Sequence, residues 1–257
     1  MPSFTGLTDL IQRKIQSKTI ILLVGLPGSG KSTICHQLSG FLNAQGYSSL
    51  VYNAGNIRRA MSSGFSDSEF FNPDNAEASQ KREKYATMCM QNMLEDLKEN
   101  RVNVGFLDAT NSTTVRRHSM LKLIQKADVE ISNIFVLDVS CTEKRLVNYN
   151  ITSKAFNQDY RGKDIATSIS DFKKRSEHYD RIFEPILSQE FVEFRNVKHF
   201  SIQNGGRTFV VPQDASDDDS CDVTLLLAAF VTNYYKTYGE SYHAAVDEFY
   251  SCALGGI

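Results

Sequence analysis

The chain has 257 residues, enough for one large domain or two small ones, and charged residues make up 23% of it. No stretch is dominated by one residue type, which excludes a fibrous or disordered protein. Lysine plus arginine number 28 and aspartate plus glutamate 30, a net charge of −2. This balance argues against bulk binding to nucleic acid or to an anionic membrane, since both need a basic excess.

The sequence carries no signal for secretion or membrane insertion. Its first five residues lack a basic and an apolar region, and the apolar run from Ile20 to Val24 is too short to cross a bilayer. The five cysteines are scattered and include no Cys-x-x-Cys pair, so we expect reduced thiols. We therefore expect a cytoplasmic protein, and the sequence allows a homodimer without indicating one.

The predicted elements alternate between short apolar strands and longer segments of helical period. Strands are expected at 19–24, 49–52, 102–107 and 131–139. Helical spacing follows in three segments, one carrying Ile34, Leu38, Phe41 and Leu42 and ending near Gly46, one at 86–97 and one at 165–183. This alternation predicts an α/β fold with a mainly parallel sheet flanked by helices.

The end of the chain differs in composition from the rest. Residues 214–222 include three consecutive aspartates and are expected to form an exposed loop. Apolar and aromatic residues then recur at helical spacing: Leu227, Phe230, Val231, Tyr234, Tyr235 and Tyr238, followed by Tyr242, Val246 and Phe249. We expect C-terminal helices that pack on the body with these tyrosines in the core, so that 1–257 is a single domain with its main body at about 19–212.

A complete phosphate-binding motif follows the first predicted strand. The segment Gly25-Leu26-Pro27-Gly28-Ser29-Gly30-Lys31-Ser32 matches G-x-x-x-x-G-K-[ST] and, with Thr33, leads into a helix. Glycines let backbone N–H groups turn toward a polyphosphate, and the helix adds the positive end of its dipole. Lys31 is expected on the β- and γ-phosphates of ATP and the Ser32 hydroxyl on Mg²⁺.

A P-loop needs a carboxylate for the metal at the end of a neighbouring strand, and Asp108 stands there. The alternative is that Asp108 caps the next helix. Asn111 or Ser112 is better placed to cap it. We therefore expect Asp108 to bind magnesium or the acceptor hydroxyl.

Six arginines suggest the chemistry of the phosphoryl acceptor: Arg58, Arg59, Arg82, Arg116, Arg117 and Arg175. Several follow predicted strand ends, on the side where α/β folds bind ligands. In a chain of near-zero net charge, convergent arginines indicate an anionic acceptor such as a sugar phosphate or a nucleotide. Spacing alone does not choose between these.

At this point the sequence resembles the kinase domain of the 6-phosphofructo-2-kinase family over roughly residues 19–212. The resemblance lies in motifs that follow the family's order: the P-loop, Tyr52-Asn53-Ala54-Gly55-Asn56-Ile57-Arg58-Arg59, Phe70-Phe71-Asn72-Pro73-Asp74-Asn75, Phe106-Leu107-Asp108-Ala109-Thr110-Asn111-Ser112-Thr113 with Arg116-Arg117, Asn150-Ile151, Asp159-Tyr160, Asp171-Phe172-Lys173-Lys174-Arg175 with Tyr179, and Gly206-Arg207-Thr208-Phe209. It implies ATP as phosphoryl donor and fructose 6-phosphate as acceptor.

The resemblance also implies roles for individual residues. Those implied to hold fructose 6-phosphate are Arg58, Arg82, Thr110, Arg116, Lys154, Arg175 and Tyr179. Asp108 matches the family's catalytic aspartate and Cys141 an active-site cysteine, although a buried structural thiol is an equal alternative for Cys141. The stretch from Asn150 to Lys154 matches a segment that lines the ATP site, and its lysine is implied to reach both substrates. This stretch is one residue shorter than in the animal enzymes, so Lys154 matches the family's lysine less closely than the arginines match theirs.

Animal members of the family carry a second, bisphosphatase domain with an R-H-G motif. The nearest approach here is Arg117-His118-Ser119, inside the kinase region. We therefore expect these residues to form fructose 2,6-bisphosphate without removing it, as in fungal kinase-only members. Two alternatives remain: a P-loop kinase for another small acceptor (a nucleotide, a nucleic-acid end or gluconate), and a catalytically silent nucleotide-binding module.

Overall fold

A central sheet of six strands organises the described part of the chain. A computed structural model describes residues 17–62, 67–156, 158–187, 189–213 and 222–254. The strand order is β2-β3-β1-β4-β5-β6, with five parallel strands and an antiparallel β6 at one edge. The strands are β1 (Thr19–Val24), β2 (Ser49–Asn53), β3 (Val104–Asp108), β4 (Asn133–Ser140), β5 (Val197–Gln203) and β6 (Thr208–Val210).

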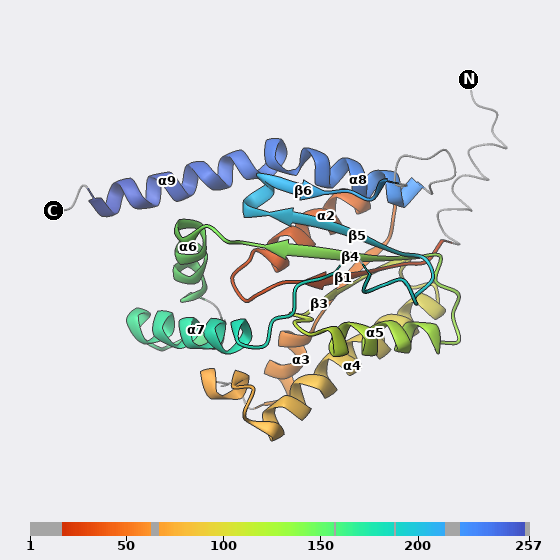
Figure 1. Cartoon of the computed structure of the whole chain (residues 1–257), viewed down its shortest axis with the longest axis horizontal. Helices are drawn as coiled ribbons and strands as arrows, with labels where there is room; N and C mark the ends of the chain where they lie inside the picture. The colour runs from red at the N-terminus through yellow and green to blue at the C-terminus, as the bar shows by residue number, and fades with distance from the viewer. Residues whose placement is uncertain (1–16, 63–66, 157, 188, 214–221, 255–257) are drawn as a thin grey trace.

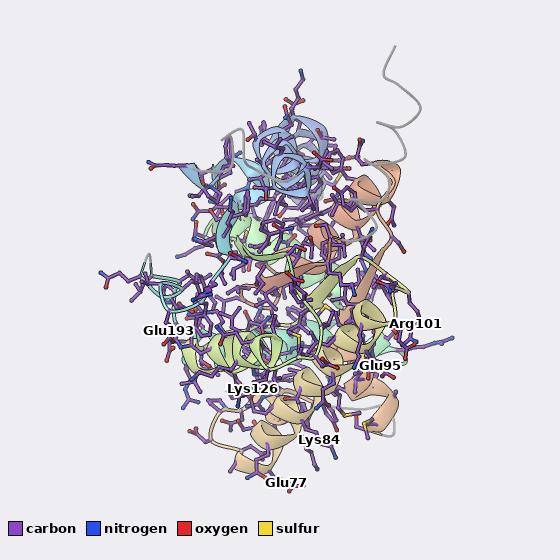
Figure 2. All side chains as sticks on the ribbon, turned by 90° about the vertical axis from the view of Figure 1, so that its right-hand side faces the viewer. Glu77, Lys84, Glu95, Arg101, Lys126 and Glu193 are labelled. Atoms are coloured by element: carbon purple, nitrogen blue, oxygen red, sulfur yellow. The ribbon has the colours of Figure 1, made fainter. Side chains whose placement is uncertain are left out.

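Helices cover both faces of the sheet (Figure 1). One face packs against α2 (Lys31–Ala44) and α8 (Asp222–Tyr234), and the other against α4 (Ala76–Lys98) and α5 (Thr114–Gln125). Because both faces are covered, all six residues of the central strand β1 are buried, and the five after Thr19 are apolar. Charged residues such as Glu77, Lys84 and Lys126 lie on the outer surface (Figure 2).

The remaining helices gather at the end of the sheet where the parallel strands finish. They are α3 (Ala54–Met61), α6 (Lys144–Lys154), α7 (Ile165–Asp180) and α9 (Glu240–Leu254), with short 3₁₀ turns at Ser68–Phe71, Gln158–Tyr160 and Asn204–Gly206. Helix α2 follows β1 on one face, and α5 follows the neighbouring β3 on the other. Adjacent strands whose helices leave to opposite faces open a crevice at their carboxyl ends, and this crevice holds the site described below.

The predicted α/β fold is confirmed, with differences in detail. The third strand begins two residues later than predicted and includes Asp108, and α7 ends at Asp180 rather than near 183. The predicted cap of α5 is wrong: Thr113 caps it by accepting a hydrogen bond from the Arg116 N–H. Asn111 is engaged elsewhere, because its amide donates to the Leu23 carbonyl oxygen at 2.7 Å.

The C-terminal helices pack on the body, as predicted, but they are continuous with each other. A π-helical turn at Tyr235–Gly239 joins α8 to α9. The prediction of core tyrosines is right for Tyr234, which is buried, and for Tyr238, which is partly buried and packs against the same core. It is wrong for Tyr235 and Tyr242, which are partly exposed and lie outside that core. The predicted acidic loop falls almost wholly on residues 214–221, outside the described residues. No helix in the described ranges is both long and apolar enough to cross a bilayer.

Candidate functional site

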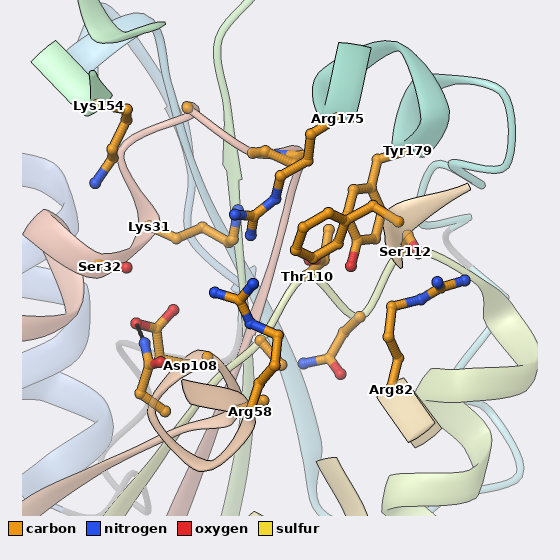
Figure 3. Close-up of a pocket in the computed structure, with 18 of the residues that line it drawn as sticks. Lys31, Ser32, Arg58, Arg82, Asp108, Thr110, Ser112, Lys154, Arg175 and Tyr179 are labelled. Carbon is orange, nitrogen blue, oxygen red and sulfur yellow. Dashed lines mark hydrogen bonds between the residues drawn. The ribbon is translucent and has the colours of Figure 1, made fainter. Parts of the chain in front are cut away.

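A cavity of about 550 Å³ opens at the carboxyl ends of β1, β2 and β3, a size typical of small-molecule sites. Its lining includes most of the residues that the sequence singled out. These are Pro27, Gly28, Gly30, Lys31, Ser32, Thr33, Arg58, Arg82, Asp108, Thr110, Arg116, Asn150, Lys154, Arg175 and Tyr179. Figure 3 shows side chains from separate elements turned toward this shared space. The predicted residues Gly25, Ser29 and Cys141 are not part of the lining.

The P-loop connects β1 to α2 and has the geometry that phosphate binding needs. Gly25 has φ 140°, and a Cβ there would lie 2.1 Å from the Val139 carbonyl oxygen, so only glycine fits. Its N–H donates to the Thr110 carbonyl oxygen at 3.1 Å, which ties the loop to the end of β3. Helix α2 begins at Lys31, its N-cap Gly30 offers no side-chain cap, and its first turn holds no acidic residue. Its positive end therefore faces the cavity without an anion of its own.

Lys31 is the most strongly perturbed cation of the P-loop. Its ammonium donates to the Leu26 carbonyl oxygen at 2.6 Å, and only 8% of the residue is exposed to solvent. Burial lowers its pKa to about 8, although the nearby Asp108 charge acts in the opposite direction. A buried cation with so little compensation is stabilised by an incoming anion, which is the role expected of a P-loop lysine.

Asp108 is held in place by the strand next to it. The register of β2 and β3 sets Asn53 opposite Asp108, and the Asn53 amide donates to Asp108 Oδ2 at 2.5 Å. Only 4% of Asp108 is exposed, and the residue lies in the same cavity as Ser32. A hydroxyl and a carboxylate are oxygen donors of the kind that Mg²⁺ prefers, so this pair fits a magnesium ion beside the P-loop.

Three arginines converge on one carboxylate, Asp159, which is 2% exposed. Arg58 donates to both of its oxygens, at 2.7 and 2.6 Å, while Arg59 lies at 3.3 Å and Arg175 at 3.4 Å. Burial raises the pKa of Asp159, but the charges of Arg58, Arg175 and Arg59 outweigh burial and lower it overall. The carboxylate therefore stays ionised, and the cluster carries a net charge of about +2.

Two donors of this cluster are left without a partner among the described residues. They are Arg58 Nη1 and Arg175 Nε, both buried. A buried guanidinium N–H without a partner is costly, unless a ligand supplies the acceptor. Arg175 also lies over the Phe71 ring at 3.9 Å, and Arg58 lies over the same ring at 5.1 Å, so the cations are fixed from a second side.

The rest of the predicted acceptor residues lie around this cluster. Arg82 of α4 donates to the Phe70 carbonyl oxygen, and Arg116 of α5 forms an ion pair with Glu83. Tyr179 packs against Phe71 with the ring centroids 5.9 Å apart. Arg117, in contrast, is 1% exposed and is bound by both oxygens of Glu190 at 2.5 and 2.7 Å, which gives it a structural role away from the cavity.

Helix α6 brings Asn150 and Lys154 to the other side of the P-loop. Lys154 is its last residue and points into the cavity (Figure 3), close enough for its charge to lower the pKa of Lys31. Cys141 directly follows β4 and lies outside the cavity lining. Burial raises the pKa of its thiol to about 11, so the thiol is protonated at neutral pH and a poor nucleophile.

The sequence indicates no role in the site for three residues that shape it: Asn53, Asp159 and Tyr242. Asp159 could have been suspected, because arginines gathered in an almost neutral chain need an anion nearby. Asn53 could have been found from the pairing of the two strand ends. Tyr242 lies far from the motifs in sequence, and no local pattern distinguishes it from its neighbouring aromatic residues.

A P-loop between β1 and α2, a buried lysine and an aspartate at the end of the neighbouring strand define a P-loop kinase fold. The family model for 6-phosphofructo-2-kinase matches residues 7–213, and the chain belongs to this family. It is 40% identical over 182 residues to 6-phosphofructo-2-kinase 1 of Saccharomyces cerevisiae, covering 69% of this chain and 22% of that protein.

Two further relatives extend the comparison. A probable 6-phosphofructo-2-kinase of Schizosaccharomyces pombe is 33% identical, over 76% of this chain and 29% of that protein. The human 6-phosphofructo-2-kinase/fructose-2,6-bisphosphatase 3 is 30% identical, over 88% of this chain and 44% of that protein. The chain thus spans 22% to 44% of the length of these three relatives.

Proposed function

We propose that this chain transfers the γ-phosphoryl group of ATP to the 2-hydroxyl of fructose 6-phosphate, giving fructose 2,6-bisphosphate and ADP. One observation carries the proposal. A single cavity is lined both by a P-loop whose helix end has no anion of its own and by a buried arginine cluster with unpartnered donors. Family membership supports the choice of reaction. We also propose that the residues described form a single kinase domain.

The P-loop half accounts for the phosphoryl donor. Lys31 and the open end of α2 would neutralise the ATP phosphates, and Ser32 and Asp108 would hold Mg²⁺. When bound, the metal would neutralise further charge on the phosphates. Because such a transfer needs little covalent chemistry from the protein, positioning and charge neutralisation account for most of the catalysis.

The arginine half accounts for the acceptor. Arg58 and Arg175 would bind the 6-phosphate through Nη1 and Nε, while Arg82, Arg116 and Thr110 would contact the rest of the sugar phosphate. Asp108, which lines the same cavity, would orient the attacking 2-hydroxyl and accept its proton, as the new oxygen–phosphorus bond forms and ADP leaves with the bridging oxygen.

The direct test is transfer of ³²P from γ-labelled Mg·ATP to fructose 6-phosphate, followed by mild acid. A phosphate on the anomeric 2-position hydrolyses readily, so the expected product is labelled, acid-labile and returns fructose 6-phosphate. Label on a nucleotide, a nucleic-acid end or gluconate would instead identify a P-loop kinase for another acceptor. ATP binding without transfer to any acceptor would indicate a silent nucleotide-binding module.

Replacing Arg82 by alanine is expected to raise the Michaelis constant for fructose 6-phosphate about tenfold or more, with little change for ATP. Arg82 lines the cavity away from the P-loop, so it is placed to contact the acceptor alone. Steady-state kinetics with each substrate varied in turn measures both constants. Lys84→Ala, two residues further along the same helix and exposed, is the matched control. An unchanged constant for Arg82→Ala contradicts its assignment.

The location that we propose is the cytoplasm. The four cysteines within the described residues, Cys35, Cys89, Cys141 and Cys252, form no disulfide. Reduced thiols are in keeping with a cytoplasmic protein.

A further inference from the structure

Helix α9 lies beyond the residues that the family model matches, yet it reaches the cavity. The family match ends at 213, whereas α9 spans Glu240–Leu254 and contributes Tyr242 to the cavity lining. In Figure 1 this helix runs past α6 at the end of the sheet where the site opens. No other residue of α8 or α9 belongs to the lining.

The Tyr242 hydroxyl is the start of a hydrogen-bond chain that ends on the P-loop. It donates to Asn150 Oδ1 at 3.0 Å, and Asn150 Nδ2 donates to the Gly28 carbonyl oxygen at 2.8 Å. The orientation of the Asn150 amide is fixed by chemistry, because a carbonyl oxygen only accepts and the NH₂ group must therefore face Gly28. Burial raises the pKa of the Tyr242 hydroxyl, which keeps it protonated as a donor.

These two hydrogen bonds hold a peptide group in the centre of the P-loop. Gly28 has φ 80°, and the peptide bond that joins it to Ser29 is held on both sides: its carbonyl by Asn150, its N–H by the Leu26 carbonyl oxygen at 3.2 Å. The Leu26 carbonyl also receives the Lys31 ammonium. A loop held in this way loses less conformational entropy when a polyphosphate binds.

Tyr242 is itself held by the turn that joins α8 to α9. A Cβ on Gly239 would lie 2.3 Å from the Gly205 carbonyl oxygen, so the π-helical turn and the 3₁₀ turn after β5 meet without room for a side chain. One residue past Tyr242, the His243 ring forms a hydrogen bond to the Asn204 carbonyl oxygen at 2.9 Å. These contacts anchor α9 to the end of the sheet.

The same helix also packs along α6, which carries Asn150. Tyr149 contacts Tyr242 and Phe249, with ring centroids 5.9 and 5.4 Å apart. Further along, Tyr250 donates to the Arg145 carbonyl oxygen at 3.1 Å. The Tyr250 hydroxyl thus contacts α6 but takes no part in the path to Gly28, which makes it a control within the same interface.

We propose that Tyr242 is a positioning residue of the nucleotide site, which acts through Asn150 to hold the P-loop in the conformation that binds ATP. This inference rests on the proposed binding of ATP and is independent of the acceptor. It gives the C-terminal helix a role in substrate binding. The hydroxyl group carries this role, and the ring serves the packing between α6 and α9.

The test is Tyr242→Phe, which removes one oxygen atom and keeps the ring. Binding of Mg·ATP, measured by titration calorimetry with no acceptor present, is expected to weaken about three- to tenfold. The Michaelis constant for fructose 6-phosphate is expected to stay within twofold. Tyr250→Phe removes a hydroxyl from the same helix and is expected to bind ATP as the parent chain does. The thermal midpoints of both variants are expected within about 4 °C of the parent.

A double-mutant cycle separates this relay from a general loosening of α9. Asn150→Ala is expected to weaken ATP binding at least as much as Tyr242→Phe, and the double variant to bind as weakly as Asn150→Ala alone, because both changes break one path. Three results would overturn the proposal. The losses of ATP affinity could multiply in the double variant, Tyr250→Phe could weaken ATP binding as much as Tyr242→Phe does, or either Tyr242→Phe or Asn150→Ala could bind ATP as the parent chain does. If Tyr242→Phe lost its fold, Asn150→Ala would test the same link from the other end.

The calorimetric readout also separates this inference from the proposed reaction. Weakened ATP binding by Tyr242→Phe, together with no transfer to fructose 6-phosphate by the parent chain, supports the relay and refutes the acceptor. Transfer to fructose 6-phosphate with ATP binding untouched by the substitution supports the reaction and refutes the relay.

Discussion

Replacing Lys31 by methionine is expected to lower phosphoryl transfer at least about a hundredfold, while the thermal unfolding midpoint stays at or above that of the parent chain. The rate is expected to fall because the P-loop has no other cation to neutralise the negative charge on the phosphoryl group during transfer. The retained stability arises because the fold already bears the cost of burying the ammonium, as the lowering of its pKa to about 8 indicates. Methionine fills the same space without the cost of burying a charge. This gain offsets the loss of the hydrogen bond to the Leu26 carbonyl oxygen.

The measurement pairs ³²P transfer with a thermal melt on the same preparation. Lys126→Met is the matched control, because Lys126 is exposed at the end of α5 on the surface seen in Figure 2. It is expected to leave both quantities unchanged. Residual activity of Lys31→Met within tenfold of the parent would contradict the assigned role of the lysine. A large fall in its melting temperature would contradict the energetic argument.

Replacing Asp159 by asparagine is expected to destabilise the fold by about 3 kcal/mol or more and to raise the Michaelis constant for fructose 6-phosphate at least about tenfold. Removing this carboxylate leaves the guanidinium groups of Arg58, Arg59 and Arg175 close together without their shared anion. For a chain of this length, such a loss corresponds to a fall of roughly 6–12 °C in the melting midpoint. The arginines then move apart, and the donors proposed for the 6-phosphate lose their positions.

Asp164→Asn is the control for this change. Asp164 caps α7 by accepting the Thr167 N–H at 2.9 Å, and asparagine caps equally well, so its charge is removed at little cost. Comparable melting temperatures and Michaelis constants for Asp159→Asn and Asp164→Asn would refute the importance of the arginine cluster.

The pH dependence provides a second check on Asp159. Its folded pKa lies below the ordinary value of 3.8, so its ion pairs stabilise the fold above that pH and are lost as the pH falls through the folded pKa. The difference in stability between the parent chain and Asp159→Asn should therefore narrow at pH values below 3.8.

The parts of the fold that the sequence predicts correctly rest on local patterns. The strand Thr19–Val24 is a continuous apolar run, and the P-loop is a contiguous motif between a strand and a helix. Asp108 was placed correctly because parallel strands end at a common edge. The sequence does not predict β5 or β6, since β5 mixes polar with apolar residues and β6 has only three residues.

The parts of the site that escaped prediction depend on contacts between distant residues. Arg58 and Asp159 are 101 positions apart, and neither neighbourhood reveals the other. Asn111 has the sequence position of a helix cap, yet the Leu23 carbonyl, 88 positions away, takes its amide and leaves the cap to Thr113. The arginines were identified as a group from composition and order, but only the fold separates those in the cavity from Arg117, which is committed to Glu190.

The packing of α2 has a consequence for the order in which the molecule is completed during synthesis. Phe41 on α2 contacts Phe230 on α8 with ring centroids 5.6 Å apart, and Gln37 accepts the Tyr234 hydroxyl at 2.9 Å across 197 positions. Helix α2, which begins with Lys31, thus emerges early from the ribosome, but its apolar face is fully covered only when α8 has been made. Contacts of such long range are slow to form and leave apolar surface open meanwhile. A nascent chain therefore contains the P-loop sequence long before the helix that follows it is fully packed.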